Sequence, residues 1–225
     1  MTHRSWCRHC ERARKAGNPH YQAPEEPEHA IPTVGIDYCF AGMEDRECIP
    51  ILVGKSRKSK RILATAVRAK GAEPCAIAWT GDLIKESGHK KMFFKSDDEP
   101  SIKQLKEQVA KEKDLHDVEI IMQEAPTGDH RANGDIEVAV REVKRQIRVI
   151  KSAMEEKLGR VIGEKDPLPA WLPRHAAFLL TRFRTGQDGK TPYERHTGKT
   201  WRRPMFSFGE SPCEAGAFCR GYPEE

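Results

Sequence analysis

The chain has 225 residues, enough for one domain of ordinary size with a small appendage. Apolar residues make up 37% and charged residues 32%, which predicts a modest core beneath a heavily charged surface. No apolar run is long enough to cross a bilayer, so the composition excludes a membrane-spanning protein. Seven cysteines without regular spacing, and no segment like a signal peptide, indicate a soluble protein of a reducing compartment.

The net charge of +5 is small, but its distribution is uneven. Residues 141–160 and 174–203 are basic, whereas 21–30 and 97–119 carry most of the acid. Basic surfaces of this kind favour a polyanionic partner, although a solvated face is the commoner explanation for any one of them.

Residues 1–20 are polar and contain the pair Cys7-x-x-Cys10, accompanied by His3, His9 and His20. A Cys-x-x-Cys pair supplies half of the four ligands that a structural Zn²⁺ requires. Residues 21–32 are rich in proline and glutamate, which predicts an extended linker.

Three short β-type runs follow at residues 33–40, 48–54 and 61–67. Only short polar turns separate them, so we expect an antiparallel meander. Pro50 has no N–H to donate to a ladder, which predicts an edge position or a bulge for the second strand.

The next elements alternate between helix and strand. A helix is expected from Pro74 to Gly88, with Ala76, Trp79 and Leu83 on one face. Then come a strand at Lys91–Ser96, a helix on which Ile102, Leu105 and Val109 share a face, and a strand near Val118–Met122. This order predicts an α/β fold: a five-stranded mixed sheet whose first three strands are antiparallel, flanked by helices. Trp79 and Trp171 are interpreted as core residues.

A long helix beginning near Asp135 is the best-defined element of the sequence. Its predicted buried stripe is Val140, Val143, Ile147, Ile150 and Met154. An adjacent face carries Glu137 followed by Arg141, Lys144, Arg148 and Lys151. One interpretation is a solvent-facing helix stabilised by i,i+4 ion pairs. The other is a helix whose acid faces a metal ion while its cations follow a phosphate backbone.

Three acids stand at the ends of predicted elements: Asp37 and Asp97 after strands, and Glu137 at the start of the long helix. Carboxylates are the oxygen ligands that Mg²⁺ accepts, and a pair of such ions can promote phosphoryl transfer. Asp98 is an alternative to Asp97, which we prefer because it directly follows its strand. No convincing Ser/His/Asp set is present, so the hypothesis is metal-dependent chemistry on nucleic acid.

At these residues the chain resembles the integrases of retroviruses and long-terminal-repeat retrotransposons. Four stretches carry the resemblance: Trp6–Cys10, Gly35–Asp37, Lys95–Pro100 and Asn133–Glu137 with the basic run after it. Weaker matches lie downstream at Pro169–Leu172, Thr191–Glu194 and Trp201–Pro204.

The resemblance implies an RNase H-like catalytic core in which Asp37, Asp97 and Glu137 hold Mg²⁺ or Mn²⁺. It also implies that Arg141 and Lys144 contact the DNA ends of the element, with Arg148 and Lys151 continuing the same face. Relatives act as multimers on nuclear DNA, so we expect a homo-oligomer, a nuclear location, no membrane, and DNA ends and target DNA as partners.

The resemblance divides the chain into four parts: a partial zinc module and linker (1–24), a catalytic core (30–165), a helical extension (166–210) and an irregular tail (211–225). In relatives the histidine ligands lie upstream of the cysteine pair. Cys7 and Cys10 are therefore expected to bind Zn²⁺ only in a longer precursor, and the chain is interpreted as part of a Pol polyprotein.

The implied activity is DNA integration, comprising 3′-end processing and strand transfer. Two alternatives stay open: an RNase H-like nuclease that cleaves without joining, and a catalytically silent DNA-binding or oligomerisation module left by a decayed element. The three acids alone do not separate these functions.

Overall fold

The computed structural model describes most of the chain. The described residues are 31–40, 49–112, 115–124, 134–163, 166–203, 205 and 208. Cys7 and Cys10, the predicted zinc module and linker (1–24) and the predicted tail (211–225) lie outside them.

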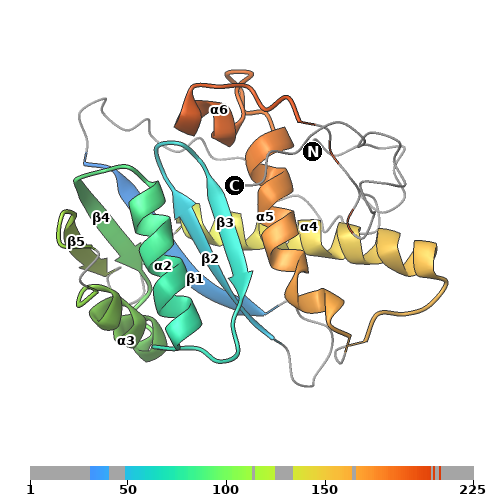
Figure 1. Cartoon of the computed structure of the whole chain (residues 1–225), viewed down its shortest axis with the longest axis horizontal. Helices are drawn as coiled ribbons and strands as arrows, with labels where there is room; N and C mark the ends of the chain where they lie inside the picture. The colour runs from blue at the N-terminus through green and yellow to red at the C-terminus, as the bar shows by residue number, and fades with distance from the viewer. Residues whose placement is uncertain are drawn as a thin grey trace, which may run out of the picture.

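Five strands form one mixed sheet (Figure 1): β1 (Thr33–Phe40), β2 (Pro50–Ser56), β3 (Ile62–Ala66), β4 (Lys91–Ser96) and β5 (Glu119–Glu124). Their order across the sheet is β3-β2-β1-β4-β5. β1, β2 and β3 are antiparallel neighbours, whereas β4 pairs parallel with β1 and β5 parallel with β4. This topology confirms the predicted five-stranded RNase H-like sheet.

Helices cover both faces of the sheet (Figure 1). They are α2 (Pro74–Glu86), α3 (Pro100–Val109), α4 (Gly134–Leu158), the short 3₁₀ helix η2 (Leu168–Ala170), α5 (Leu172–Phe183) and α6 (Pro192–Thr197). Buried side chains of α2 and α3 pack with one face, and those of α4 and α5 with the other. The predicted α4 stripe is confirmed, because Val143, Ile147, Ile150 and Met154 are buried and Val140 packs beside them.

The alternation of side chains along β1 decides which residues face which helices. Val34, Ile36 and Tyr38 belong to the core beneath α2 and α3, whereas Cys39 belongs to the core beneath α4 and α5. Because side chains alternate along a strand, Asp37 also lies on the α4 side. Within the described residues, β4 and β5 contribute nothing to the buried core beneath α4 and α5. On this side of the sheet, the buried core shared with α4 and α5 therefore rests on β1, β2 and β3.

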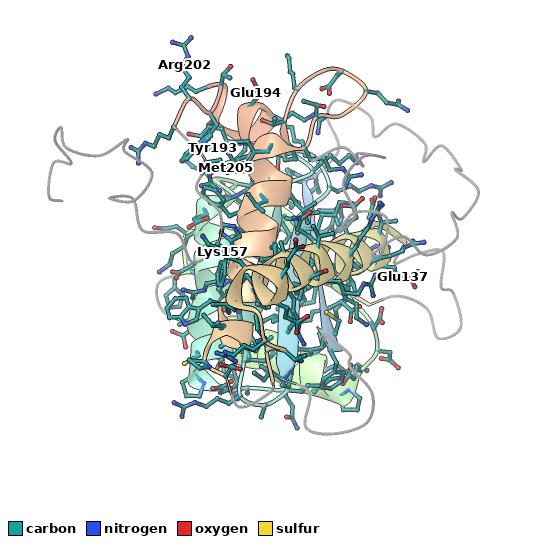
Figure 2. All side chains as sticks on the ribbon, turned by 90° about the vertical axis from the view of Figure 1, so that its right-hand side faces the viewer. Glu137, Lys157, Tyr193, Glu194, Arg202 and Met205 are labelled. Carbon is teal, nitrogen blue, oxygen red and sulfur yellow. The ribbon has the colours of Figure 1, made fainter. Side chains whose placement is uncertain are left out.

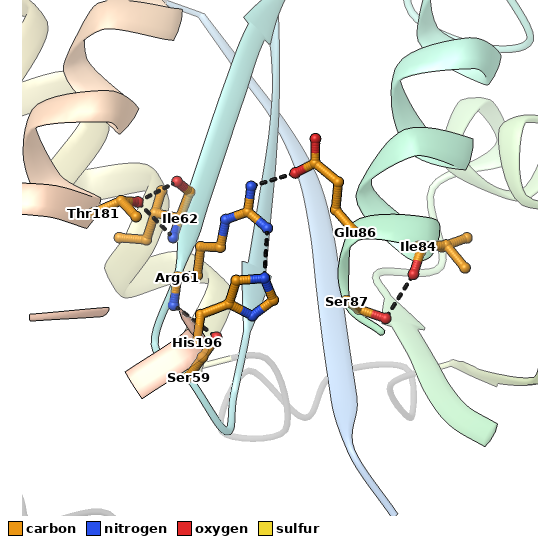
Figure 3. A network of polar contacts seen from close by, with 8 residues as sticks. All are labelled: Ser59, Arg61, Ile62, Ile84, Glu86, Ser87, Thr181 and His196. Atoms are coloured by element: carbon orange, nitrogen blue, oxygen red, sulfur yellow. Dashed lines mark hydrogen bonds and ion pairs between the residues drawn. The ribbon is translucent and has the colours of Figure 1, made fainter. Parts of the chain in front are cut away.

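The edge strand β3 is protected by α5 through a side chain (Figure 3). The hydroxyl of Thr181 accepts a hydrogen bond from the backbone N–H of Ile62 at 3.3 Å and donates to its carbonyl at 2.7 Å. Arg61 pairs with Glu86 of α2 and lies 3.2 Å from Nε2 of His196 in α6. These contacts occupy polar groups that an exposed edge would offer to another strand.

A capping box starts α6. The Thr191 side chain accepts from the backbone N–H of Glu194 at 3.1 Å, and the Glu194 carboxylate accepts from the backbone N–H of Thr191 at 2.6 Å. The stretch Thr191–Glu194 therefore has a local structural role, because the box satisfies two donors at the helix start.

Two sequence predictions are wrong. β2 lies inside the sheet rather than at an edge, and Pro50 is tolerated because it is the first residue of the strand, where its carbonyl accepts from Val67 at 2.9 Å. Trp171 is 59% exposed, because it stands at the junction of η2 and α5 with its ring outside the core. Trp79 is partly buried and packs against the core beneath α2 and α3, as predicted.

Two glycines provide a matched test of this packing. A Cβ on Gly54 would lie 2.5 Å from Cδ2 of Leu83 and 3.3 Å from the ring of Trp79, so β2 and α2 meet closely there. We expect Gly54→Ala to lower the free energy of unfolding by about 1–3 kcal/mol. Gly81→Ala, within α2 with nothing inside 4 Å of the new Cβ, should raise it by about 0.5–1 kcal/mol. Urea unfolding measures both, and equal effects would contradict the close approach.

Candidate metal and nucleic-acid site

Parallel pairing of β1 with β4 brings Asp37 and Asp97 together. Gly35 is the last register partner on β1, opposite Lys95, so Asp37 lies two residues beyond this pair on β1 and Asp97 directly follows the end of β4 at Ser96. Side chains that are two residues apart point to the same side of a sheet. The Asp37 carboxylate is therefore directed to the α4 side, and Asp97 stands close enough, just beyond the end of β4, for its charge to act on Asp37.

The two carboxylates interact electrostatically. Burial is the main reason that the pKa of Asp37 rises from an ordinary 3.8 to about 7, and the negative charge of Asp97 is the second. Glu99 adds to the rise in this pKa, whereas the backbone N–H of Tyr38 and the ammonium of Lys70 oppose it. A half-buried carboxylate beside a second one is typical of a site that takes up a proton or a cation.

Lys70 is held near this pair by the loop after β3. The hydroxyl of Tyr38 lies 3.2 Å from both the backbone N–H and the carbonyl of Gly71, which ties the loop to β1. The Lys70 ammonium donates to Glu99 at 2.8 Å and lies 5.1 Å from the ring centroid of Phe40. A cation therefore stands beside the acids. The sequence analysis missed it because no local pattern links residue 70 with residue 37.

Glu137 occupies the first turn of α4 and is exposed to solvent. Figure 2 shows it near one end of this helix, with Lys157 toward the other. Its neighbour Ile136 packs on the sheet, 3.4 Å from where a Cβ on Gly35 would be. Among the described residues no three His, Cys, Asp or Glu side chains are gathered closely enough to hold a metal ion. Asp37 and Asp97 thus interact as a pair of acids, and Glu137 stands apart from them on the adjoining helix.

Asp98, the alternative to Asp97, is exposed and forms an ion pair with Lys103 of α3. It is Asp97 whose charge acts on Asp37. Glu99, two residues further on, also acts on Asp37, although the sequence analysis had placed it only within the motif around Asp97.

The four predicted DNA-binding cations of α4 differ in exposure. Arg141 and Arg148 are exposed, and Lys144 is partly buried. Lys144 lies near the Cys39 thiol: burial raises the pKa of this thiol to about 12, and the charge of Lys144 opposes the rise. Lys151 is 13% exposed and lies 3.5 Å from Glu155, so it matches the ion-paired interpretation of this helix. Arg141, Lys144 and Arg148 remain available on the face that begins with Glu137.

Comparison with solved structures identifies the fold. The catalytic core domain of BIV integrase superposes with a TM-score of 0.51 at 17% identity, covering 74% of this chain and 93% of that one. The HTLV-2 integrase catalytic core, solved with magnesium as a trimer, gives 0.51 at 11% identity, covering 73% and 95%. The integrase of the simian T-cell lymphotropic virus intasome, solved with a PP2A regulatory subunit, gives 0.57 at 13%, covering 87% and 65%. The chain has the fold of a retroviral integrase catalytic core.

No family model matches this integrase-like chain, and no curated protein matches it. The similarity in three dimensions bears out the resemblance noted from short motifs, but the sequence identities are too low to transfer function. Within the part of the chain that the structure describes, no helix is both long and apolar enough to span a membrane.

The raised pKa of Asp37 predicts a stability that depends on pH. Between pH 4 and 7 the folded protein binds a proton that the unfolded chain has released, so the free energy of unfolding should fall as pH rises through 7. Asp37→Asn removes the buried charge. We expect it to be more stable than wild type by about 1–4 kcal/mol at pH 8, with a smaller difference at pH 4.

Urea unfolding at the two pH values, with EDTA present, measures this difference. Asp98→Asn is the matched control, because Asp98 is exposed, and it should keep the pH dependence of wild type. An Asp37→Asn variant with the same pH dependence as wild type would contradict a buried carboxylate at this position.

Proposed function

We propose that this chain catalyses DNA integration by metal-dependent polynucleotidyl transfer, comprising 3′-end processing and strand transfer of retroelement DNA. The observation that carries the proposal is the electrostatic interaction of Asp97, at the end of β4, with the half-buried Asp37 of the parallel neighbour β1, in an integrase-like fold. Support also comes from α4, which starts with an acid and continues with exposed cations.

In this proposal Asp37 and Asp97 hold Mg²⁺ or Mn²⁺, and Glu137, which stands apart from the pair in this structure, joins the ligand set from α4 when the ion is bound. The HTLV-2 core solved with magnesium is a precedent of the same fold. When bound, such ions lower the pKa of the attacking oxygen and neutralise charge on the leaving oxygen. Asp37 is suited to this role, because burial beside Asp97 makes its negative charge unfavourable without a cation.

The α4 cations Arg141, Lys144 and Arg148 bind the DNA backbone by charge, with little dependence on base sequence. Lys151 contributes less, because its partner Glu155 already compensates its charge. Joining two DNA ends requires more than one copy of the site, so we propose a homo-oligomer that acts in the nucleus. Zn²⁺ binding by Cys7 and Cys10 is proposed only for a longer precursor.

A strand-transfer assay with Mg²⁺ or Mn²⁺ tests the reaction. Asp97→Asn should lower the rate of joining by at least about 100-fold, because loss of a ligand removes several kcal/mol of transition-state stabilisation. Asp98→Asn should keep the activity. Joined products support an integrase, cleaved products alone support the nuclease, and a gel shift without either supports the silent DNA-binding module.

Metal binding is tested independently of activity by thermal unfolding. At pH 8, Mg²⁺ at about 100 times its dissociation constant should stabilise the wild-type chain by about 2.7 kcal/mol. Asp37→Asn should lose most of this stabilisation, whereas Asp98→Asn should keep it. An equal response of all three proteins would show that the carboxylate pair does not bind the ion.

A second binding test uses the cations of α4. Lys144→Ala and Arg148→Ala should each weaken DNA binding and reduce the slope of log affinity against log salt by about 0.9 on duplex DNA. Lys151→Ala is the matched control on the same face, and its slope should stay close to wild type because of its ion pair with Glu155. If Lys151→Ala reduced the salt slope more than Lys144→Ala or Arg148→Ala, the assignment of Lys144 and Arg148 to DNA binding and of Lys151 to an ion pair would be contradicted.

A further inference from the structure

A small cavity beside the first turn of α4 is lined mainly by cations. Its volume is about 30 Å³, and its charged lining residues are Lys55, Arg57 and Lys95 against a single carboxylate, Asp135. None of these residues belongs to the carboxylate pair or to the basic row of α4.

The register of the sheet builds this cavity. Lys55 of β2, Gly35 of β1 and Lys95 of β4 are direct neighbours across three strands. The middle position has no side chain, and Ile136 packs above it, 3.4 Å from where a Cβ would be. Two lysines therefore flank a gap in the sheet surface.

Charge in the cavity is not balanced. Lys55 Nζ lies 3.1 Å from the backbone carbonyl of Asp135 and 3.9 Å from its carboxylate, while Arg57 Nε lies 3.0 Å from the same carboxylate. Lys55 is only 8% exposed, and burial lowers its pKa. For Lys95 no ion pair is found within the described ranges. Three cations thus line a cavity whose lining holds one carboxylate, although Glu142 also acts on Lys55, and a bound anion would stabilise this arrangement.

The cavity lies next to the carboxylate pair. Gly35 precedes Asp37 by two residues on β1, and Lys95 precedes Asp97, which directly follows the end of β4, by two residues. Two residues of a strand span about 6.6–6.8 Å. A row of cations therefore adjoins the row of acids at roughly the distance from one nucleotide to the next.

We propose that this cavity is a phosphate subsite, in which Lys95, with Lys55 and Arg57, holds the non-bridging oxygens of a DNA phosphate neighbouring the one at Asp37 and Asp97. The class of ligand rests on the proposed function. The competing explanation is structural: Lys55 and Arg57 attach α4 to β2 through Asp135. Lys95 separates the two explanations, because it stands outside those ion pairs.

The test measures DNA binding by the full chain in EDTA, as fluorescence anisotropy of a labelled duplex over a series of KCl concentrations. Lys95→Ala should weaken binding to all sequences and reduce the salt slope by about 0.9. Lys95→Arg keeps the charge and should restore the slope. Lys91→Ala is the control on the same side of β4, where Lys91 pairs with Glu119 at 2.7 Å, and it should leave the slope unchanged.

Thermal melts first establish that each variant folds, and Lys95→Gln, which keeps most of the aliphatic stem, serves as a second neutral variant. If both neutral variants keep the wild-type slope of log affinity against log salt, the subsite is overturned. The proposed function is unaffected if Lys144→Ala still lowers that slope. Binding of inorganic phosphate at Lys95 without any binding of DNA overturns it as well. If the Lys95 variants weaken DNA binding but the wild-type chain neither joins nor cleaves DNA, the subsite is supported and the proposed integrase activity is contradicted.

Discussion

Parallel pairing between β1 and β4 is the constraint on which the candidate site depends. Asp37 and Asp97 are 60 positions apart in the chain, yet the pairing of β1 with β4, which runs to Gly35–Lys95, brings them close enough for their charges to interact. A slip of one residue would send Asp97 to the opposite face, beneath α2 and α3, because side chains alternate along a strand. The same register places two like charges side by side, and burial of Asp37 makes this unfavourable unless a proton or a cation is bound.

The two faces of the sheet differ in what they leave exposed. On one face α2 and α3 cover the sheet with buried residues drawn from β1, β2 and β4, which keeps the register rigid. On the other face α4 and α5 build their core on β1, β2 and β3. The acids lie where this second core ends. A polymer can reach that border without any part of the core being opened, as a site that acts on a long strand requires.

Charge is organised in neighbouring rows on this surface. Lys55 and Lys95 flank Gly35, two residues before Asp37 on β1, and α4 carries further exposed cations. Lys70 and Glu99 form an ion pair at the far end of β1. Such a pattern suits a polyanion held beside a bound cation, because attraction along the backbone and charge compensation at the acids act on different groups.

Local patterns in the amino-acid sequence were sufficient for the five strands, for α2, α3 and α4, and for the α4 stripe, because periodicity and turn residues act over a few positions. They were misleading for Pro50 and Trp171, whose surroundings come from distant segments. Which strands are neighbours, which acids meet, and how Lys55 and Lys95 flank Gly35 follow only from long-range packing. Contacts of that kind depend on strand order and register, which no stretch of sequence specifies until the whole core is buried.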